Sequence, residues 1–141
     1  MISKHALVVP QRVLDTRNTA GGPIGYDETG ALVTVGQLPV DATRRYSLHG
    51  RTFGTLSVPG DVKGALVNVT LSQAGPSGGY VTLYHGDGTA PNASTVNPAT
   101  SIAASFWWTG IPTGASFPGT FGAFSAAGPR DLIVDLVGYY R

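Results

Sequence analysis

The chain of 141 residues contains no cysteine. This absence excludes disulfide bonds, cysteine-ligated metal sites and a thiol nucleophile. Charged residues are also scarce, at 12% of the chain, about half the usual ~25%. Nine basic and eight acidic residues give a formal net charge of +1. Because this balance provides no basic field for a nucleic-acid backbone, we expect no nucleic-acid partner.

Long apolar runs are missing too. No stretch approaches the roughly 18 uninterrupted apolar residues of a membrane-spanning helix, so we expect no membrane insertion. The apolar run at residues 6–9 stops at Pro10 and is soon followed by Arg12, unlike a secretory signal. We therefore expect no export signal, the alternative being a signal peptide that precedes the residues printed here.

Turn-forming residues and alternating apolar residues are abundant. The chain has 20 glycines and 10 prolines, and these residues interrupt most of its apolar segments. In residues 67–71, the apolar side chains of Val67, Val69 and Leu71 share one face of a strand. Residues 80–84 repeat this alternation after a Gly- and Pro-rich connection, so we expect the two segments to form a hairpin.

Short segments rich in β-branched and aromatic residues recur along the rest of the chain. Further strands are expected at residues 6–9, 12–14, 31–35, 44–48, 53–58, 94–96, 102–108, 120–124 and 132–139. No window shows amphipathic helical spacing. We therefore predict an all-β fold, a single antiparallel β-sandwich that is jelly-roll-like, with many short strands and long Gly- and Pro-rich loops. Residues 12–141 would form this sandwich domain, and residues 1–11 an N-terminal extension or an added strand.

The predicted core consists of the apolar side chains that alternate along three of these strands. They are Val67, Val69, Leu71, Val81, Leu83, Leu132, Val134 and Leu136.

No catalytic or metal-binding motif is present. The histidines His5, His49 and His85 lack the partner spacing of simple metal motifs. There is no Gly-x-Ser-x-Gly elbow, no phosphate-binding glycine loop and no dinucleotide fingerprint. We expect no catalytic residues, no metal and no cofactor, and therefore a protein that is not an enzyme.

The aromatic strand at residues 106–108 needs a further explanation. Period-two geometry sends Phe106 and Trp108 to one face and Trp107 to the other, so both faces carry a large aromatic side chain. The outward side could be covered by a loop of the same domain, by another subunit, or by a sugar that stacks on the rings. Phe117 is the fourth candidate for such an interface or glycan contact. Residues 2–9 form a second candidate, because a short strand there could extend a neighbour's sheet.

Charged residues near the two ends of the chain also need an explanation. Arg12, Asp15 and Arg17 lie close together in the sequence, and Asp135 lies in a very apolar segment. Since isolated charges are costly inside a protein, Asp135 should be paired or at a sheet rim. We predict a structural ion-pair clamp between the first and last strands, the alternative being a catalytic or binding role.

Several of these segments, taken in order, resemble a known family. They are residues 12–17 with Gly21 and Gly22, then residues 64–70, 79–84, 93–97 and 131–140. This series is similar to an all-β domain of secreted actinobacterial cell-surface proteins and of small minor tail proteins of actinobacteriophages. The resemblance implies a non-enzymatic surface module and supplies no catalytic residues. The chain departs from the family pattern at residues 105–108 and 116–119, which could mark a contact surface of its own.

The resemblance and the missing export signal together suggest a function. Virion proteins assemble inside the host and need no signal peptide, so we expect a bacteriophage virion surface protein, first a minor tail protein and next a capsid decoration protein. Its partners would be other virion proteins, further copies of itself and a host cell-wall glycan. The alternative is a carbohydrate-binding or adhesion module of an actinobacterial cell-envelope protein, located outside the cell or at its surface.

Overall fold

The computed structural model describes residues 2–18, 23–36, 38–39, 41–72, 80–96, 103–114, 116–126 and 130–141. Over these residues the chain is all-β and forms no helix. Accordingly, the described part of the chain contains no helix that is long and apolar enough to span a membrane. The strands are β1 (Lys4–Asp15), β2 (Thr43–Ser47), β3 (Thr52–Phe53), β4 (Leu56–Ser57), β5 (Gly64–Ser72), β6 (Tyr80–His85), β7 (Ala103–Gly110), β8 (Thr120–Ala126) and β9 (Asp131–Tyr140).

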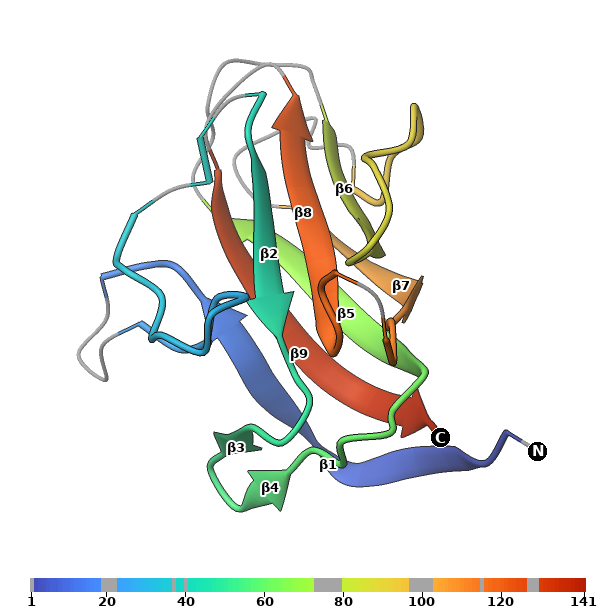
Figure 1. Ribbon diagram of the computed structural model, residues 1–141. Helices are drawn as coiled ribbons and strands as arrows, with labels where there is room; N and C mark the ends of the chain where they lie inside the picture. Colours follow the sequence, from blue (N-terminus) through green and yellow to red (C-terminus); the bar gives the residue numbers. More distant parts are fainter. Residues whose placement is uncertain are drawn as a thin grey trace.

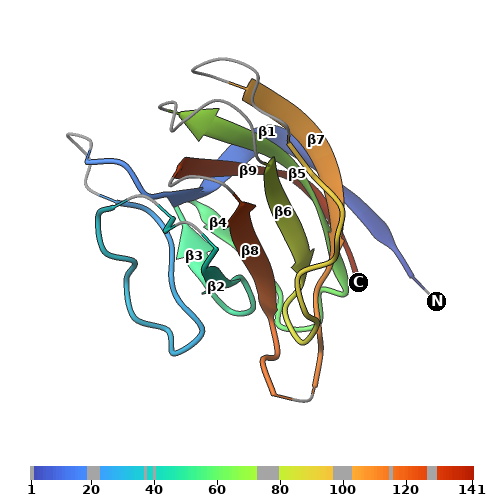
Figure 2. The same cartoon turned by 90° about the horizontal axis from the view of Figure 1, so that it is seen from above.

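The strands form two packed layers. One sheet has the order β1-β9-β5-β7 and the other β2-β8-β6, while β3 and β4 make a small separate hairpin. All of these pairings are antiparallel. Figures 1 and 2 show the three-stranded sheet facing the four-stranded one, with β1 and β9 side by side. The predicted all-β sandwich is therefore confirmed.

The core lies between the two sheets. All eight predicted core residues are at most 2% exposed, which confirms the alternation in β5, β6 and β9. Large side chains from elsewhere complete this core, among them Leu14, Leu48 and Phe121. Because one face of each strand is buried, the side chains at alternate positions of the four-stranded sheet point to its outer face.

The predicted hairpin between residues 67–71 and 80–84 is wrong. These residues lie in β5 and β6, which belong to opposite sheets. From β5 to β9, each successive strand lies in the other sheet. The apolar faces of β5 and β6 would be buried either if the two strands were neighbours in one sheet or if they faced each other across the core. In this structure the two strands belong to the two sheets that face each other.

Three other predicted strands differ from the structure. Residues 31–35 form no strand, only an isolated bridge between Leu32 and Tyr26, and Leu32 is exposed. Residues 94–96 likewise make one bridge, from Val96 to Val81. Residues 53–58 contain the two short strands β3 and β4 instead of one strand. Residues 53–58 turn back on themselves at Gly54, whose φ is positive, so β3 and β4 pair with each other.

The N-terminal segments at residues 6–9 and 12–14 belong to one strand, β1. Its pairing with β9 is interrupted between Ala6 and Gln11, where β1 carries extra residues. Within this bulge, Val8 is fully exposed and Val9 is also exposed. The bulge therefore places two apolar side chains in solvent.

Candidate functional site

The outer face of the four-stranded sheet brings predicted residues from both ends of the chain together. Strand pairing places Phe106 opposite Asn68, Asn68 opposite Asp135, and Asp135 opposite Arg12. These residues lie on β7, β5, β9 and β1, so they cross the whole sheet in one row. The aromatic ring of Phe106 at the β7 edge is thus followed by the side chains of Asn68, Asp135 and Arg12, and we call these three residues the polar row.

Two exposed aromatic rings lie at the β7 edge of this face. Phe106 is 67% exposed and Trp108 is 48% exposed. The two residues alternate with Trp107, so they share one side of β7, as predicted. Among the described residues, Phe106 and Trp108 are the two aromatic members of the set of exposed large apolar side chains.

Contacts with two neighbouring strands fix the position of Trp108. Its indole meets the Tyr140 ring of β9 edge to face, with 4.2 Å between the ring centroids. The six-membered part of the indole lies over Gly64 of β5, where an added Cβ would clash with Cη2 of the ring. The ring therefore lies across β5 because residue 64 has no side chain. No local sequence pattern pointed to Gly64 or Tyr140, since only the register brings them to Trp108.

The other two aromatic candidates lie elsewhere. Trp107 points into the sandwich, where its Nε1 donates a hydrogen bond to the carbonyl oxygen of Leu83 at 3.2 Å. Phe117 precedes β8 of the opposite sheet, and the guanidinium carbon of Arg45 lies 3.9 Å from its ring centroid. The structure thus brings Phe106 and Trp108 together and leaves Trp107 and Phe117 out of their surface.

The ion pair between Arg12 and Asp135 joins β1 to β9. Arg12 donates from Nε to Oδ1 of Asp135 at 2.9 Å and from Nη2 to Oδ2 at 3.3 Å. Its Nη1 also lies 3.6 Å from Oδ2 of Asp15. The hydrogen bond to Asp135 raises the pKa of Arg12 above its usual value. The predicted clamp between the first and last strands is confirmed.

Asp15 is the most buried member of this cluster. Only 3% of its side chain is exposed, and Arg17 donates to both of its oxygens, at 3.0 and 2.9 Å. Burial acts to raise the pKa of Asp15, but the hydrogen bonds and charge of Arg17, with the charge of Arg12, outweigh it and lower the pKa. The carboxylate therefore remains charged and acts as a structural anchor.

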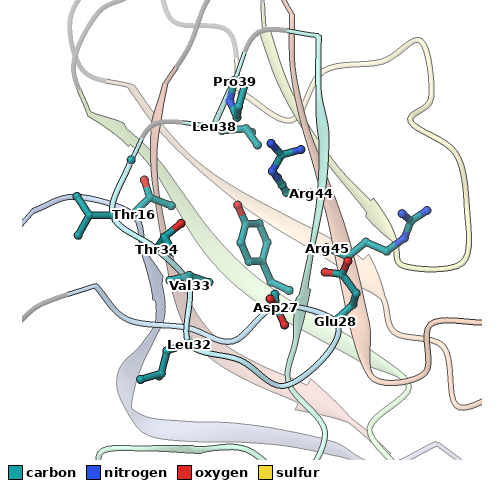
Figure 3. Close-up of a pocket in the computed structure, with 13 residues that line it drawn as sticks. Thr16, Asp27, Glu28, Leu32, Val33, Thr34, Leu38, Pro39, Arg44 and Arg45 are labelled. Atoms are coloured by element: carbon teal, nitrogen blue, oxygen red, sulfur yellow. The ribbon is translucent and has the colours of Figure 1, made fainter.

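A surface hollow of about 390 Å³ lies beside β2, away from the aromatic face. Figure 3 shows Leu38 and Pro39 at one end and Asp27 and Glu28 at the other. Several of its polar groups are already engaged. Asp27 accepts hydrogen bonds from the backbone nitrogens of Thr29 and Ala31, and Arg45 donates to the carbonyl oxygen of Gly86. Burial raises the pKa of Tyr46, which also lines the hollow, to about 12.

The described residues offer no metal site, and similarity to known proteins assigns none of them a role. In the described ranges, no group of three or more His, Asp or Glu residues could hold a metal ion. No protein-family model, curated protein or solved structure matches the chain. The arrangement of residues on the outer face is therefore the basis for the functional argument.

Proposed function

We propose that this chain is a non-enzymatic structural protein of the bacteriophage virion surface. Its first proposed position is the tail, as a minor tail protein, and the second is the capsid, as a decoration protein. There it would act in particle assembly or in contact with the host surface. The resemblance of the ordered segments supports the family, and the outer face of the four-stranded sheet supports a role in binding.

The observation that carries the binding role is the exposure of Phe106 and Trp108 on one side of β7. Large apolar groups on a protein surface cost free energy unless a partner covers them. Here they lie on a sandwich whose first and last strands, β1 and β9, are joined by the ion pair of Arg12 with Asp135. Such a scaffold presents a fixed surface and needs no catalytic groups.

Mass spectrometry of purified virions tests this proposal. Particles of the phage that encodes the chain are banded in a density gradient, washed in high salt and quantified against the major tail and capsid proteins. We expect this chain at a fixed ratio to one of them in independent preparations. Its absence from washed particles would overturn the virion role. A location in the bacterial envelope, found by fractionating cells, would instead support the cell-surface alternative.

A further inference from the structure

We propose that the outer face of the four-stranded sheet binds a neutral glycan. The sugar rings would stack on Trp108 and Phe106, and their hydroxyl groups would bond to the polar row of Asn68, Asp135 and Arg12. This inference rests on the proposed function, because it names the chemistry of the partner that the same surface would contact. It assigns no role to Trp107 or Phe117.

The Trp108 ring of the site is held in place before any ligand arrives. Residues 64–71 of β5 pair with residues 103–110 of β7 without a bulge, so Phe106 and Trp108 stand two residues apart, about 7 Å along the strand. Tyr140 and Gly64 hold the indole of Trp108 in place. The apolar C–H face of a sugar ring packs well on such an aromatic face, whose π electrons attract the slightly positive hydrogens. A fixed ring loses little conformational freedom when a ligand binds.

The polar part of the site offers both donors and acceptors. Among the described residues, the Asn68 side chain forms no hydrogen bond, although it stands between Phe106 and Asp135 in the row. Its amide can donate through nitrogen and accept through oxygen. The Asp135 carboxylate binds Arg12 and retains further lone pairs, and 39% of the Arg12 side chain is exposed. Hydroxyl groups of a sugar can both donate and accept, so they match all three groups.

The same row argues against a protein as the occupant. Charged residues are depleted at the centres of protein interfaces, because an apolar partner would remove the water that solvates them. A polyhydroxylated ligand replaces that water with hydrogen bonds. Because the charges of Arg12 and Asp135 compensate each other, the row does not favour an ionic ligand. The surface therefore suits a neutral glycan better than a second copy of the chain.

Isothermal titration calorimetry on the purified chain tests the inference. The probes are hexasaccharides of glucose, mannose and galactose, with a hexamer of galacturonic acid as the acidic comparison. We expect at least one neutral hexasaccharide to bind, with binding about tenfold or more weaker in Trp108→Ala and in Phe106→Ala, which corresponds to about 1.4 kcal/mol or more. Asn68→Ala should also weaken binding.

Two further variants separate the site from general effects of mutation. Gly64→Ala removes no aromatic residue, but its Cβ would displace the Trp108 indole, so it should weaken binding like Trp108→Ala. Phe117→Ala removes an aromatic ring from the segment before β8, outside the outer face of the four-stranded sheet, and should bind like the wild type. Circular dichroism and thermal unfolding confirm that each variant is folded. Should Trp108→Ala not fold, the more exposed Phe106 still provides the test.

Three results would overturn the inference: no binding of any neutral hexasaccharide by the folded wild type, unchanged binding by Phe106→Ala and Trp108→Ala, or binding of the galacturonic acid hexamer alone. These results are independent of the virion measurement. A chain found in virions that fails to bind these sugars would remove only the glycan inference. Sugar binding by a chain absent from virions would remove only the virion role.

Discussion

Arg12 on the first strand and Asp135 on the last strand form a two-point ion pair, with Nε 2.9 Å from Oδ1 and Nη2 3.3 Å from Oδ2. Their backbones pair directly in the antiparallel β1–β9 ladder. The side chains thus reinforce a contact between segments 123 residues apart in the sequence. This contact fixes the β1 end of the polar row and ties the edge strand β1 to its neighbour β9.

Asp135→Asn should lower the free energy of unfolding by about 1 kcal/mol, because it removes a charge-assisted pair that water partly screens. The exposed fractions are 39% for the Arg12 side chain and 20% for that of Asp135, so the effect of a fully buried pair is not expected. Urea unfolding followed by tryptophan fluorescence measures the change. Asp61→Asn is the matched control, since Asp61 pairs with Arg141 at an exposed position and should unfold like the wild type. Equal stabilities of wild type and Asp135→Asn would contradict this prediction.

Asp15→Asn should lower the free energy of unfolding by about 2 kcal/mol at neutral pH. The substitution removes the buried negative charge to which Arg17 donates two hydrogen bonds. The folded state lowers the pKa of Asp15. Its contribution to stability is therefore present above the unfolded pKa of about 3.9 and is lost as the pH falls through the lower, folded value. Unfolding measured between pH 7 and pH 2 should show the difference between wild type and variant shrinking below about pH 4. A difference that stays constant over this range would mean that Asp15 does not titrate as described.

Neighbouring tryptophans should differ sharply in their contribution to stability. Trp107→Ala removes packing and a hydrogen bond to Leu83 inside the sandwich, and we expect a loss of about 3 kcal/mol. Trp108→Ala removes a half-exposed ring and should cost about 1 kcal/mol or less. Chemical unfolding of the two single variants, monitored by circular dichroism, provides the comparison. Similar losses in both would contradict the assignment of Trp107 to the core and Trp108 to the surface.

The alternation of residues predicted much of this architecture. Val67, Val69 and Leu71 alternate with polar residues, so the buried face of β5 could be read directly. The opposite directions of Trp107 and Trp108 follow from the same period. What alternation lacks is information on the partner strand, which is set by long-range pairing. For this reason, the hairpin of β5 with β6 was predicted wrongly.

The candidate site was only partly visible in the sequence for the same physical reason. The clamp could be predicted because an acid such as Asp135 in an apolar strand requires a partner. The contact of Trp108 with Gly64 and Tyr140 spans three strands, and no local pattern encodes it. Asn68 joins the site only through its register with Phe106 and Asp135. These residues are far apart in the chain, and only the order and register of the strands bring them together.

Self-association should involve the bulge of β1. Val8 is 101% exposed and Val9 is also exposed, on an edge strand of the sheet. Since exposed apolar side chains on a sheet edge favour contact between chains, we expect the wild type to associate at high concentration. The double variant Val8→Lys, Val9→Lys should associate less without losing stability. Sedimentation velocity over a concentration series measures both proteins, and a wild type that stays monomeric throughout would contradict the prediction.

The role of the outer face is tested most directly by a nuclear magnetic resonance titration of the two indole N–H signals. The chain has two tryptophans. The Trp107 indole bonds to Leu83 in the core, while Trp108 lies on the outer face. Titration of the ¹⁵N-labelled protein with the neutral hexasaccharide that binds most tightly should shift the Trp108 signal and leave that of Trp107 nearly unchanged, the two being assigned with Trp108→Phe. A shift of Trp107 alone, or of neither signal at concentrations up to solubility, would contradict the assignment of this face as the contact surface.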